Sequence, residues 1–490
     1  MVSFSLGNFS FFILYSKFFI DNMPDSSFFI PHSSLKKKIN DSPVARWTVL
    51  VIVATAMMMG YLLNDIMSPL ETLLELPVEQ GGLGWSSTDY GFFSGAGGFI
   101  NVFLLMLFFS GLILDKMGVR FTGVLSCSLM LIGVGIKYYA VTNPALIGQI
   151  FNFQFSIFNL NVTLPMSAAI ASLGFSIFGV GYEMCGITVS KAMVRWFTGH
   201  ELALAMGIQL AMARLGTAMA LSVSAPLARH FSLSTPLLVG LICLLIGLVS
   251  FLVFCVLDIR LDKDEKMLNA QCSILNSDDD SFRFRDIGLI LKNPGFWLIT
   301  LFVVLFYSAV SPFLKFATKL MIEKYSVAPD IAGFFTSIAP FGTMLMTPLF
   351  GSLYDKYGRG VTLIVIGTAM LTFVHFGFSL PIHASAFAIF LMVVLSVGYS
   401  LTPAALWPIV PKIIPLKCLG TAYSLIFFIQ NFGRAIIPMF VGRANETDPT
   451  YTTGMQIFAC TGLAGGLVAV AMLWLDKKKG YGLEKPNIER

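Results

Sequence analysis

The sequence predicts an all-α membrane protein whose twelve transmembrane helices form two pseudo-symmetric six-helix bundles. Three observations predict this fold. The composition is 56% apolar and only 12% charged, whereas soluble domains are about 25% charged. Apolar runs of about twenty residues, each long enough to cross a bilayer core of ~30 Å, recur along the chain. The pattern Gly-x-x-x-Asp-Lys-x-Gly also occurs twice, from Gly111 and from Gly351, which indicates a duplicated unit.

The apolar runs divide six and six around the longest polar segment of the chain. In the first half they lie near residues 47–67, 88–113, 120–140, 166–190, 202–228 and 235–257. In the second half they lie near residues 295–316, 330–353, 360–380, 384–407, 418–442 and 454–475. We therefore expect an N-terminal bundle over 45–257, a cytoplasmic linker over 258–292 and a C-terminal bundle over 293–476, with cytoplasmic tails at 1–44 and 477–490.

Lysine and arginine residues predict the orientation of these helices in the bilayer. Segments on one side of the spans hold about three times as many as segments on the other, and residues 140–165 carry no charge. The main exceptions are Lys315, Lys319 and Lys324, near the outer end of the seventh span. The positive-inside rule then predicts that both termini are cytoplasmic. Without an acidic dileucine sorting signal, we expect the protein in the plasma membrane.

The first forty residues contain no convincing span. The apolar run 11–20 is short and interrupted by Lys17, and no small-residue cleavage site follows it. We expect a disordered tail in this region, and Met23 is an alternative start of the chain.

Both copies of the repeated pattern fall in short loops, between spans 2 and 3 and between spans 8 and 9. Glycine at the first position lets two helices approach closely. An aspartate at a helix end can pair with a nearby arginine or accept from the amides of a neighbouring helix. We expect a conformational latch on the cytoplasmic side; the alternative is an ordinary positively charged turn. Its residues are Gly111, Asp115, Lys116, Gly118 and Arg120, and then Gly351, Asp355, Lys356, Gly358 and Arg359.

Two opposite charges are predicted inside the bilayer, where ionisable side chains are costly and usually functional. Glu183 precedes the cytoplasmic end of span 4 by 12 residues, and Arg214 follows that of span 5 by 13 residues. At 1.5 Å per residue, both lie about 18–20 Å deep. They are interpreted either as a structural ion pair between spans 4 and 5 or as a split site for a zwitterion. In the second case the guanidinium binds a carboxylate and the acid binds an ammonium.

Weaker candidates lie in other spans. Asp65, near the outer end of span 1, is either a proton-coupling carboxylate or a solvated helix end. Gln209 and Asn431 can hydrogen bond peptide groups, although bonding between helices is the commoner fate of such amides. Trp407 is expected in the cavity wall or in an interfacial aromatic belt. Arg434 adds a charge in span 11 that suits an anion.

Six spans followed by six, with the repeated loop pattern, resemble the major facilitator superfamily of secondary transporters. That resemblance implies two bundles that rock about a central site. The runs G181-Y-E183, W196-F-T-G-H-E-L202 and G207-I-Q-L-A-M-A-R-L-G216 resemble more closely the lysosomal dipeptide transporters of that superfamily. So do A405-L-W-P408, L419-G-T-A-Y423 and I429-Q-N-F-G433, and the spacing of Tyr61 and Asp65. This closer resemblance implies dipeptide transport, with Glu183 facing the peptide amine and Arg214 facing its carboxylate.

The sequence therefore predicts a carrier of small solutes rather than an enzyme. It has no Walker A pattern, no metal-ligand spacing and no nucleophile elbow, so we expect no cofactor, and a net charge of +5 gives no case for nucleic acid. The expected partners are a small solute and the bilayer, with protons as a candidate coupling ion, and we expect a monomer. The alternative substrate is a small organic anion held by Arg214 and Arg434. A receptor or scaffold that does not transport is the alternative of another class.

Overall fold

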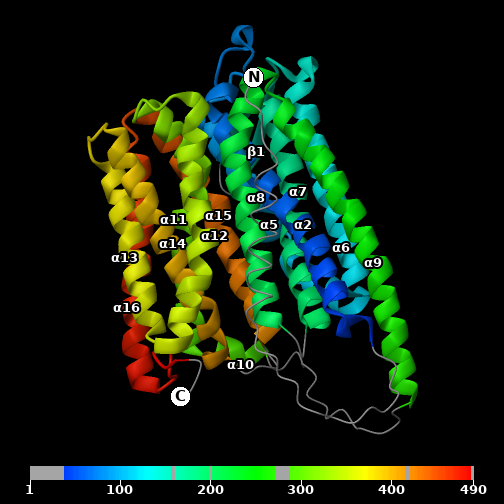
Figure 1. The fold of residues 1–490 in the computed structure, drawn as a ribbon. Helices are drawn as coiled ribbons and strands as arrows, with labels where there is room; N and C mark the ends of the chain where they lie inside the picture. The colour runs from blue at the N-terminus through cyan, green and yellow to red at the C-terminus, as the bar shows by residue number, and fades with distance from the viewer. Residues whose placement is uncertain (1–37, 156–159, 198–200, 272–286, 415–418, 487–490) are drawn as a thin grey trace. The chain divides into compact units, whose positions relative to one another are not determined.

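The computed structural model describes residues 38–155, 160–197, 201–271, 287–414 and 419–486. Figure 1 shows that, from residue 39 onward, long helices run alongside one another. Eleven of the helices in these ranges are long and apolar enough to cross a membrane. The chain is therefore an all-α membrane protein, as the sequence predicts, with one short β-hairpin added.

Within the described residues, the first half contains four short 3-10 helices, eight α-helices and the hairpin. Their bounds are η1 Ile39–Asp41, α2 Pro43–Asp65, η2 Ser68–Leu70, α3 Glu71–Leu74, η3 Val78–Gln80, α4 Ser87–Ala96, α5 Phe99–Phe103, α6 Met106–Thr142, η4 Pro144–Leu146, β1 Ile150–Phe155, β2 Leu160–Pro165, α7 Met166–Phe197, α8 Leu202–His230 and α9 Thr235–Gln271. The described residues of the second half form seven α-helices. These are α10 Ile287–Leu291, α11 Pro294–Glu323, α12 Pro329–Tyr357, α13 Gly360–Ser379, α14 Ser385–Ile413, α15 Leu419–Thr447 and α16 Thr452–Lys479.

The second predicted span is a broken helix, which is why it is not one of the eleven. It comprises α4, α5 and the start of α6. The break follows Ala96, where a Cβ on Gly97 would lie 3.0 Å from the Phe175 ring. A second break falls at Leu105, whose φ is 53°. With this span included, the helices are consistent with the predicted count of twelve.

Two segments differ from the sequence prediction. Helix α9 continues through Gln271, whereas the polar linker was predicted to begin at residue 258. Its extra turns persist because their carboxylates pair with arginines of neighbouring helices, as described below. Residues 150–155 and 160–165, for which the sequence predicted no regular structure, pair as an antiparallel hairpin with Ile150 opposite Pro165.

The two ends of the helices can be named by what lies there. We call the end that carries β1 and β2 the hairpin side, and the end where α2 begins and α16 ends the terminal side (Figure 1). On the hairpin side, Lys319 of α11 pairs with Glu75 and lies 3.6 Å from Glu71. A Cβ on Gly91 of α4 would lie 3.0 Å from the Cα of Gly442 in α15. These contacts join the two bundles, so the hairpin side is closed in this structure.

Ion pairs within the N-terminal bundle hold the terminal side of that bundle. Asp258 of α9 is fully buried and accepts from Arg195 of α7 at 2.9 Å and from the Trp196 indole at 3.0 Å. Arg120 of α6 lies 3.4 Å from Asp258 and 2.6 Å from Asp262. The arginine of the first repeated pattern thus binds α9 within its own bundle.

Candidate functional site

A central cavity of about 490 Å³ lies between the two bundles, with walls from both. Helices α2, α7 and α8 line it from one bundle and α11, α14 and α15 from the other. The lining residues are Tyr61, Asn64, Asp65, Tyr182, Arg214, Thr217, Tyr307, Ser311, Leu314, Tyr399, Gln430 and Arg434.

Arg214 lies against aromatic rings. Its guanidinium carbon is 4.8 Å from the centre of the Tyr399 ring and 6.0 Å from that of Tyr61. Rings at this distance attract a cation, yet they leave the N–H groups of the guanidinium available to a ligand. Within the described residues, no carboxylate forms an ion pair with Arg214.

Glu183 does not pair with Arg214, which removes the interpretation of a structural ion pair between spans 4 and 5. Its carboxylate instead accepts from Arg434 of α15 at 2.5 Å, a contact between the bundles. The guanidinium of Arg434 also lies 5.7 Å from the Tyr182 ring. Glu183 lies beside the central cavity rather than in its lining, and the helix that faces it comes from the other half of the chain.

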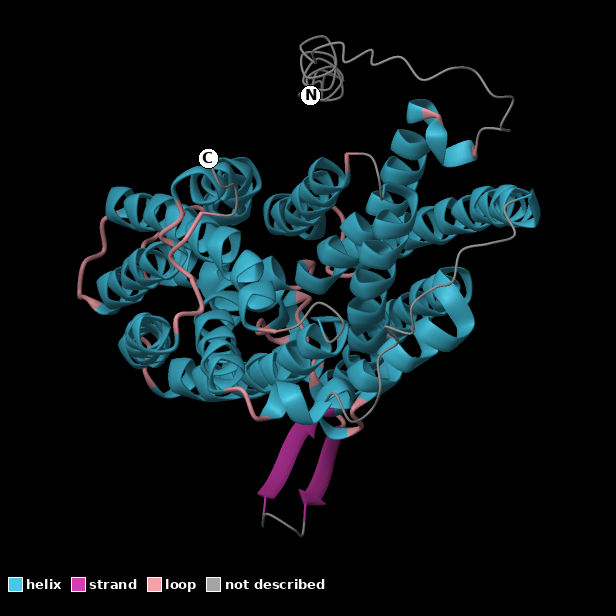
Figure 2. Ribbon diagram, turned by 90° about the horizontal axis from the view of Figure 1, so that it is seen from below, coloured by secondary structure: helices cyan, strands magenta, loops and turns pink. Residues whose placement is uncertain are grey.

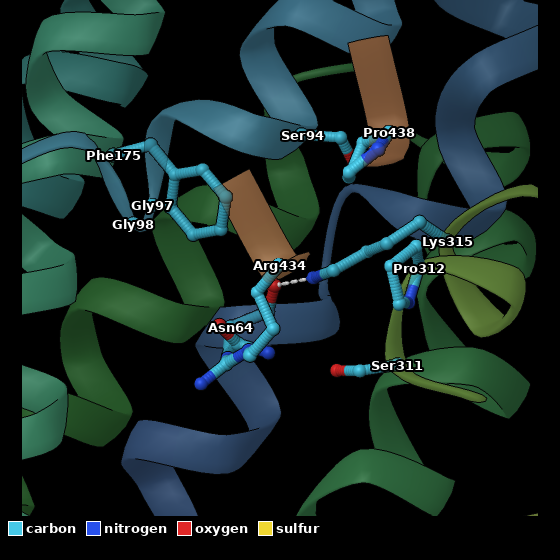
Figure 3. A pocket seen from close by; sticks show the side chains of 10 residues that line it. All are labelled: Asn64, Ser94, Gly97, Gly98, Phe175, Ser311, Pro312, Lys315, Arg434 and Pro438. Carbon is cyan, nitrogen blue, oxygen red and sulfur yellow. Dashed lines mark hydrogen bonds between the residues drawn. The ribbon is translucent and has the colours of Figure 1, made fainter. Parts of the chain in front are cut away.

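Asp65 is buried and paired, so it is not a solvated helix end. Lys315 of α11 contacts it at 2.7 Å, and the Thr217 hydroxyl donates to it at 3.0 Å. The Lys315 ammonium also donates to the backbone oxygen of Asn64, as the dashed line in Figure 3 shows. Lys137 of α6 is buried behind this pair and donates to the backbone oxygen of Leu63 at 3.3 Å.

A smaller cavity of about 320 Å³ adjoins the central one on the side of Lys315 (Figure 3). Asn64, Ser311 and Arg434 line both cavities. Gly97 and Gly98, at the break between α4 and α5, also line the smaller one. The broken second span therefore places backbone beside the site, as is typical of discontinuous helices that line a cavity.

The remaining predicted residues lie around the cavity rather than in its lining. Trp407 packs behind Tyr307, with ring centres 6.3 Å apart, and also contacts Phe427. Gln209 is buried and donates to Ser190 at 3.3 Å, which is the bonding between helices that the sequence analysis offered as the alternative. Asn431 donates within its own helix, to the backbone oxygen of Phe427 at 2.9 Å.

The repeated pattern shows matching backbone geometry in the two halves. Gly118 interrupts α6 at φ 79°, and Gly358 ends α12 at φ 69°. Glycine adopts these positive φ values without the steric cost that other residues bear. The side chain of Asp115 lies outside the described residues. The Arg359 N–H donates to the backbone oxygen of Glu484 at 2.7 Å, and Lys356 lies over the Tyr357 ring. Gly111, Lys116, Gly351 and Asp355 stay latch predictions.

Lys315 and the tyrosines at positions 182, 307 and 399 are site residues that the sequence analysis missed. Lys315 was noted only as an exception to the loop-charge rule. It falls inside the predicted run 295–316, so the cost of a charge within a span was a signal for it. The tyrosines gave no signal, because aromatic residues are common in apolar spans.

Comparison with known proteins identifies the family. The Major Facilitator Superfamily model matches residues 145–438, which is more than half of the chain. The protein belongs to the Major Facilitator Superfamily. It is therefore a membrane transporter of small solutes and not an enzyme, in agreement with the absence of nucleophile and metal motifs in the sequence.

Several superfamily members are similar along most of the chain. The lysosomal dipeptide transporter MFSD1 of Gallus gallus is 31% identical over 314 residues, which cover 62% of this chain and 68% of the relative. That of Homo sapiens is 28% identical over 391 residues, which cover 77% and 76%. Because these relatives are named lysosomal, the expectation of the plasma membrane finds no support, and only an integral membrane location is established.

Solved superfamily structures share the fold. The nucleoside transporter NupG has a TM-score of 0.61 at 14% identity and covers 87% of this chain and 98% of its own. A POT peptide transporter in complex with sulfate has a TM-score of 0.61 at 13% identity and covers 89% and 95%. At such identities the likeness establishes the fold alone.

Proposed function

We propose that this transporter carries dipeptides, bound between Glu183 and Arg214 in the central cavity. The observation that carries the proposal is the guanidinium of Arg214. It lies against tyrosine rings in the cavity wall without a carboxylate partner among the described residues. A planar guanidinium binds a carboxylate through two parallel hydrogen bonds, so the peptide C-terminus suits this position.

The ammonium of the peptide would bind Glu183. In this structure the guanidinium of Arg434 pairs with the Glu183 carboxylate at 2.5 Å. The ammonium of the ligand would therefore displace Arg434 from Glu183. Arg434 comes from the opposite bundle. Exchange of the internal cation for the ligand would therefore release one contact between the bundles, which is the kind of linkage that alternating access requires.

The names of the similar proteins agree with a peptide substrate. Both curated relatives described above are named dipeptide transporters. Tyrosine rings from both bundles wall the cavity, and aromatic walls of this kind suit a peptide side chain. A receptor or scaffold that binds without transporting would show no substrate exchange across a bilayer. A measurement of that exchange with and without a pH gradient also tests coupling to protons.

A small organic anion is the second candidate, and the charge at the cavity favours it. Arg214, Arg434 and Asp65 line the central cavity. Beside it, Lys315 pairs with Asp65 and Glu183 pairs with Arg434. Three positive and two negative charges leave +1, which a single carboxylate neutralises. A zwitterion neutralises it only if its ammonium displaces Arg434 from Glu183.

Counterflow in proteoliposomes tests the proposal. The purified full-length protein should exchange labelled dipeptide, with and without a pH gradient to read proton coupling. Unlabelled dipeptide should compete, whereas an N-acetylated dipeptide, without the ammonium, and a dipeptide amide, without the carboxylate, should not. Competition by the N-acetylated peptide at full strength would favour the anion carrier. Absence of any counterflow with either ligand class would contradict transport of both.

Variants of Arg214 supply the matching genetic test. Arg214→Gln should reduce dipeptide counterflow about 10- to 100-fold, because hydrogen bonds to charged groups contribute about 1.5–3 kcal/mol. Arg214→Lys should recover only part of the loss, since an ammonium lacks the paired donor geometry. Arg443→Gln is the control, because Arg443 is exposed on α15. Unchanged transport by Arg214→Gln would refute the assigned role.

A further inference from the structure

The hairpin β1–β2 carries an Asn-x-Thr triplet, Asn161-Val162-Thr163. This triplet, with any residue except proline in the middle, is the acceptor for N-linked glycans when it lies on an accessible segment outside the cytoplasm. Three further Asn-x-Ser/Thr triplets occur in the chain. They begin at Asn8, Asn40 and Asn445.

The register of the hairpin places the acceptor on its polar face. Phe153 is opposite Val162 and Phe155 is opposite Leu160, so one face is apolar. Asn152 is opposite Thr163 and Gln154 is opposite Asn161, so the other face is polar. Successive residues of a strand alternate between faces, and both members of the pair Asn152 and Thr163 are exposed.

The hairpin also extends away from the helices, as Figure 2 shows. Asn161 is five residues before Met166, where α7 begins. At about 3.4 Å per residue this is roughly 17 Å of strand. The hairpin joins the end of α6 to the start of α7, at the opposite end of the helices from the terminal side. The distribution of Lys and Arg predicts that the terminal side is cytoplasmic, so the hairpin is predicted to lie outside the cytoplasm. The strand that carries Asn161 therefore lies on the side that a transferase in the secretory pathway would reach.

The other triplets within the described residues are poor acceptors. Asn40 is buried, and its backbone oxygen accepts from Arg46 at 2.7 Å. Asn445 is buried inside α15, where its side-chain oxygen would lie 2.3 Å from a Cβ added to Gly454. Asn8 lies outside the described residues. Among the three triplets within the described residues, Asn161 is therefore the best candidate for the glycan acceptor.

We propose that Asn161 is an N-glycosylation site. The amide nitrogen of Asn161 would form a bond to the anomeric carbon of an oligosaccharide carried on a polyprenyl diphosphate lipid. The bond from that carbon to the lipid phosphate breaks, the lipid diphosphate leaves, and the amide proton passes to a base of the transferase. The Thr163 hydroxyl completes the recognition triplet. This inference does not depend on the substrate that the carrier transports.

The test uses the full-length protein expressed in a eukaryotic host with a secretory pathway. Treatment of the membrane fraction with peptide N-glycosidase F should shift the protein to higher mobility by a single step. Asn161→Gln and Thr163→Ala should each abolish the shift, whereas Thr163→Ser should retain it. Asn152→Gln, on the same polar face but outside any triplet, and Asn445→Gln should also retain it.

Mass spectrometry gives an independent reading that does not depend on how the variants fold. Release of the glycan by the same enzyme in ¹⁸O-labelled water converts a glycosylated Asn161 to labelled aspartate. Recovery of the labelled peptide from mature protein would support the proposal. Recovery of Asn161 unmodified throughout the membrane fraction, or a mobility shift that persists in Asn161→Gln, would overturn it.

Discussion

At the scale of single residues, the site depends on how each buried charge is balanced. Glu183 pairs with Arg434 and Asp65 pairs with Lys315, both across the two bundles. Arg214 is balanced by tyrosine rings instead. Charges in low dielectric are costly unless they are paired, so a ligand carboxylate gains most at Arg214. A ligand ammonium must compete for Glu183.

Glu183→Gln should separate the two substrate classes. An amide cannot balance an ammonium, so dipeptide counterflow should fall at least about 10-fold, as expected for a lost charged hydrogen bond. Release of Arg434 should leave transport of a small monoanion intact or faster. Glu79→Gln is the matched control, since Glu79 is exposed on the hairpin side. Dipeptide transport at the wild-type rate in Glu183→Gln would remove this residue from the site.

Asp65 and Lys315 should show coupling in a double-mutant cycle. Asp65→Asn leaves Lys315 buried with no acid, and Lys315→Met leaves Asp65 without its cation, so each single variant should lose thermal stability or transport. Removal of both charges should restore part of the loss, because an uncompensated buried charge costs about 3–5 kcal/mol. Thermal melting and counterflow of the four proteins measure this coupling. Strictly additive losses would argue against a working pair.

At the scale of elements, α9 shows how a span can extend past its apolar run. Its continuous apolar run ends at Leu257, yet the helix continues through Gln271. Asp258, Asp262 and Glu265 follow at intervals of four and three residues, which place them on one face of the helix. Arg195 contacts all three of them. The polar segment is therefore ordered by contact with α7.

Asp258→Asn should test the strength of this contact. The carboxylate is fully buried between Arg195 and the Trp196 indole, and removal of one partner from a buried pair costs about 3 kcal/mol or more. The melting temperature of the detergent-solubilised protein should fall clearly. Asp330→Asn is the control, because Asp330 is 68% exposed at 3.8 Å from Arg229 and should change stability by less than about 1 kcal/mol. Equal effects of the two variants would contradict the structural role of Asp258.

At the scale of the whole molecule, the structure is one state of a two-bundle carrier. The bundles meet on the hairpin side through Lys319 with Glu75, and through close packing of α4 on α15. A Cβ on Gly91 would lie 2.5 Å from the backbone oxygen of Pro438. Only glycine permits this approach, so the closed hairpin side depends on residues with no side chain at the contact.

An alanine at this contact should slow transport. In Gly91→Ala the added Cβ would lie 2.5 Å from the backbone oxygen of Pro438, so α4 and α15 must separate and the closed hairpin side should lose stability. Counterflow should fall, because alternating access requires this side to close. Gly135→Ala is the control, because a Cβ there would meet no atom within 4 Å. Equal counterflow by the two variants would show that this contact does not limit transport.

The sequence predicted much of the fold for physical reasons that act locally. Apolar runs of about twenty residues must cross the bilayer as helices because backbone groups in hydrocarbon have no water to bond. The second span, interrupted at Gly97 and Leu105, was predicted as continuous because a break depends on close neighbours such as Phe175. The hairpin at 150–165 was missed as β-structure because its pairing depends on the register between two short strands.

The sequence by itself determined the membrane helices, and it predicted their grouping into two halves and a similar depth for Glu183 and Arg214. Depth follows from counting residues along a helix. Only the tertiary structure decided that Glu183 meets Arg434, that Asp65 meets Lys315, and that Arg214 faces tyrosines. These choices depend on which helices lie side by side and how each is rotated. Both are fixed by packing between residues far apart in the chain, so no count along one helix reveals them.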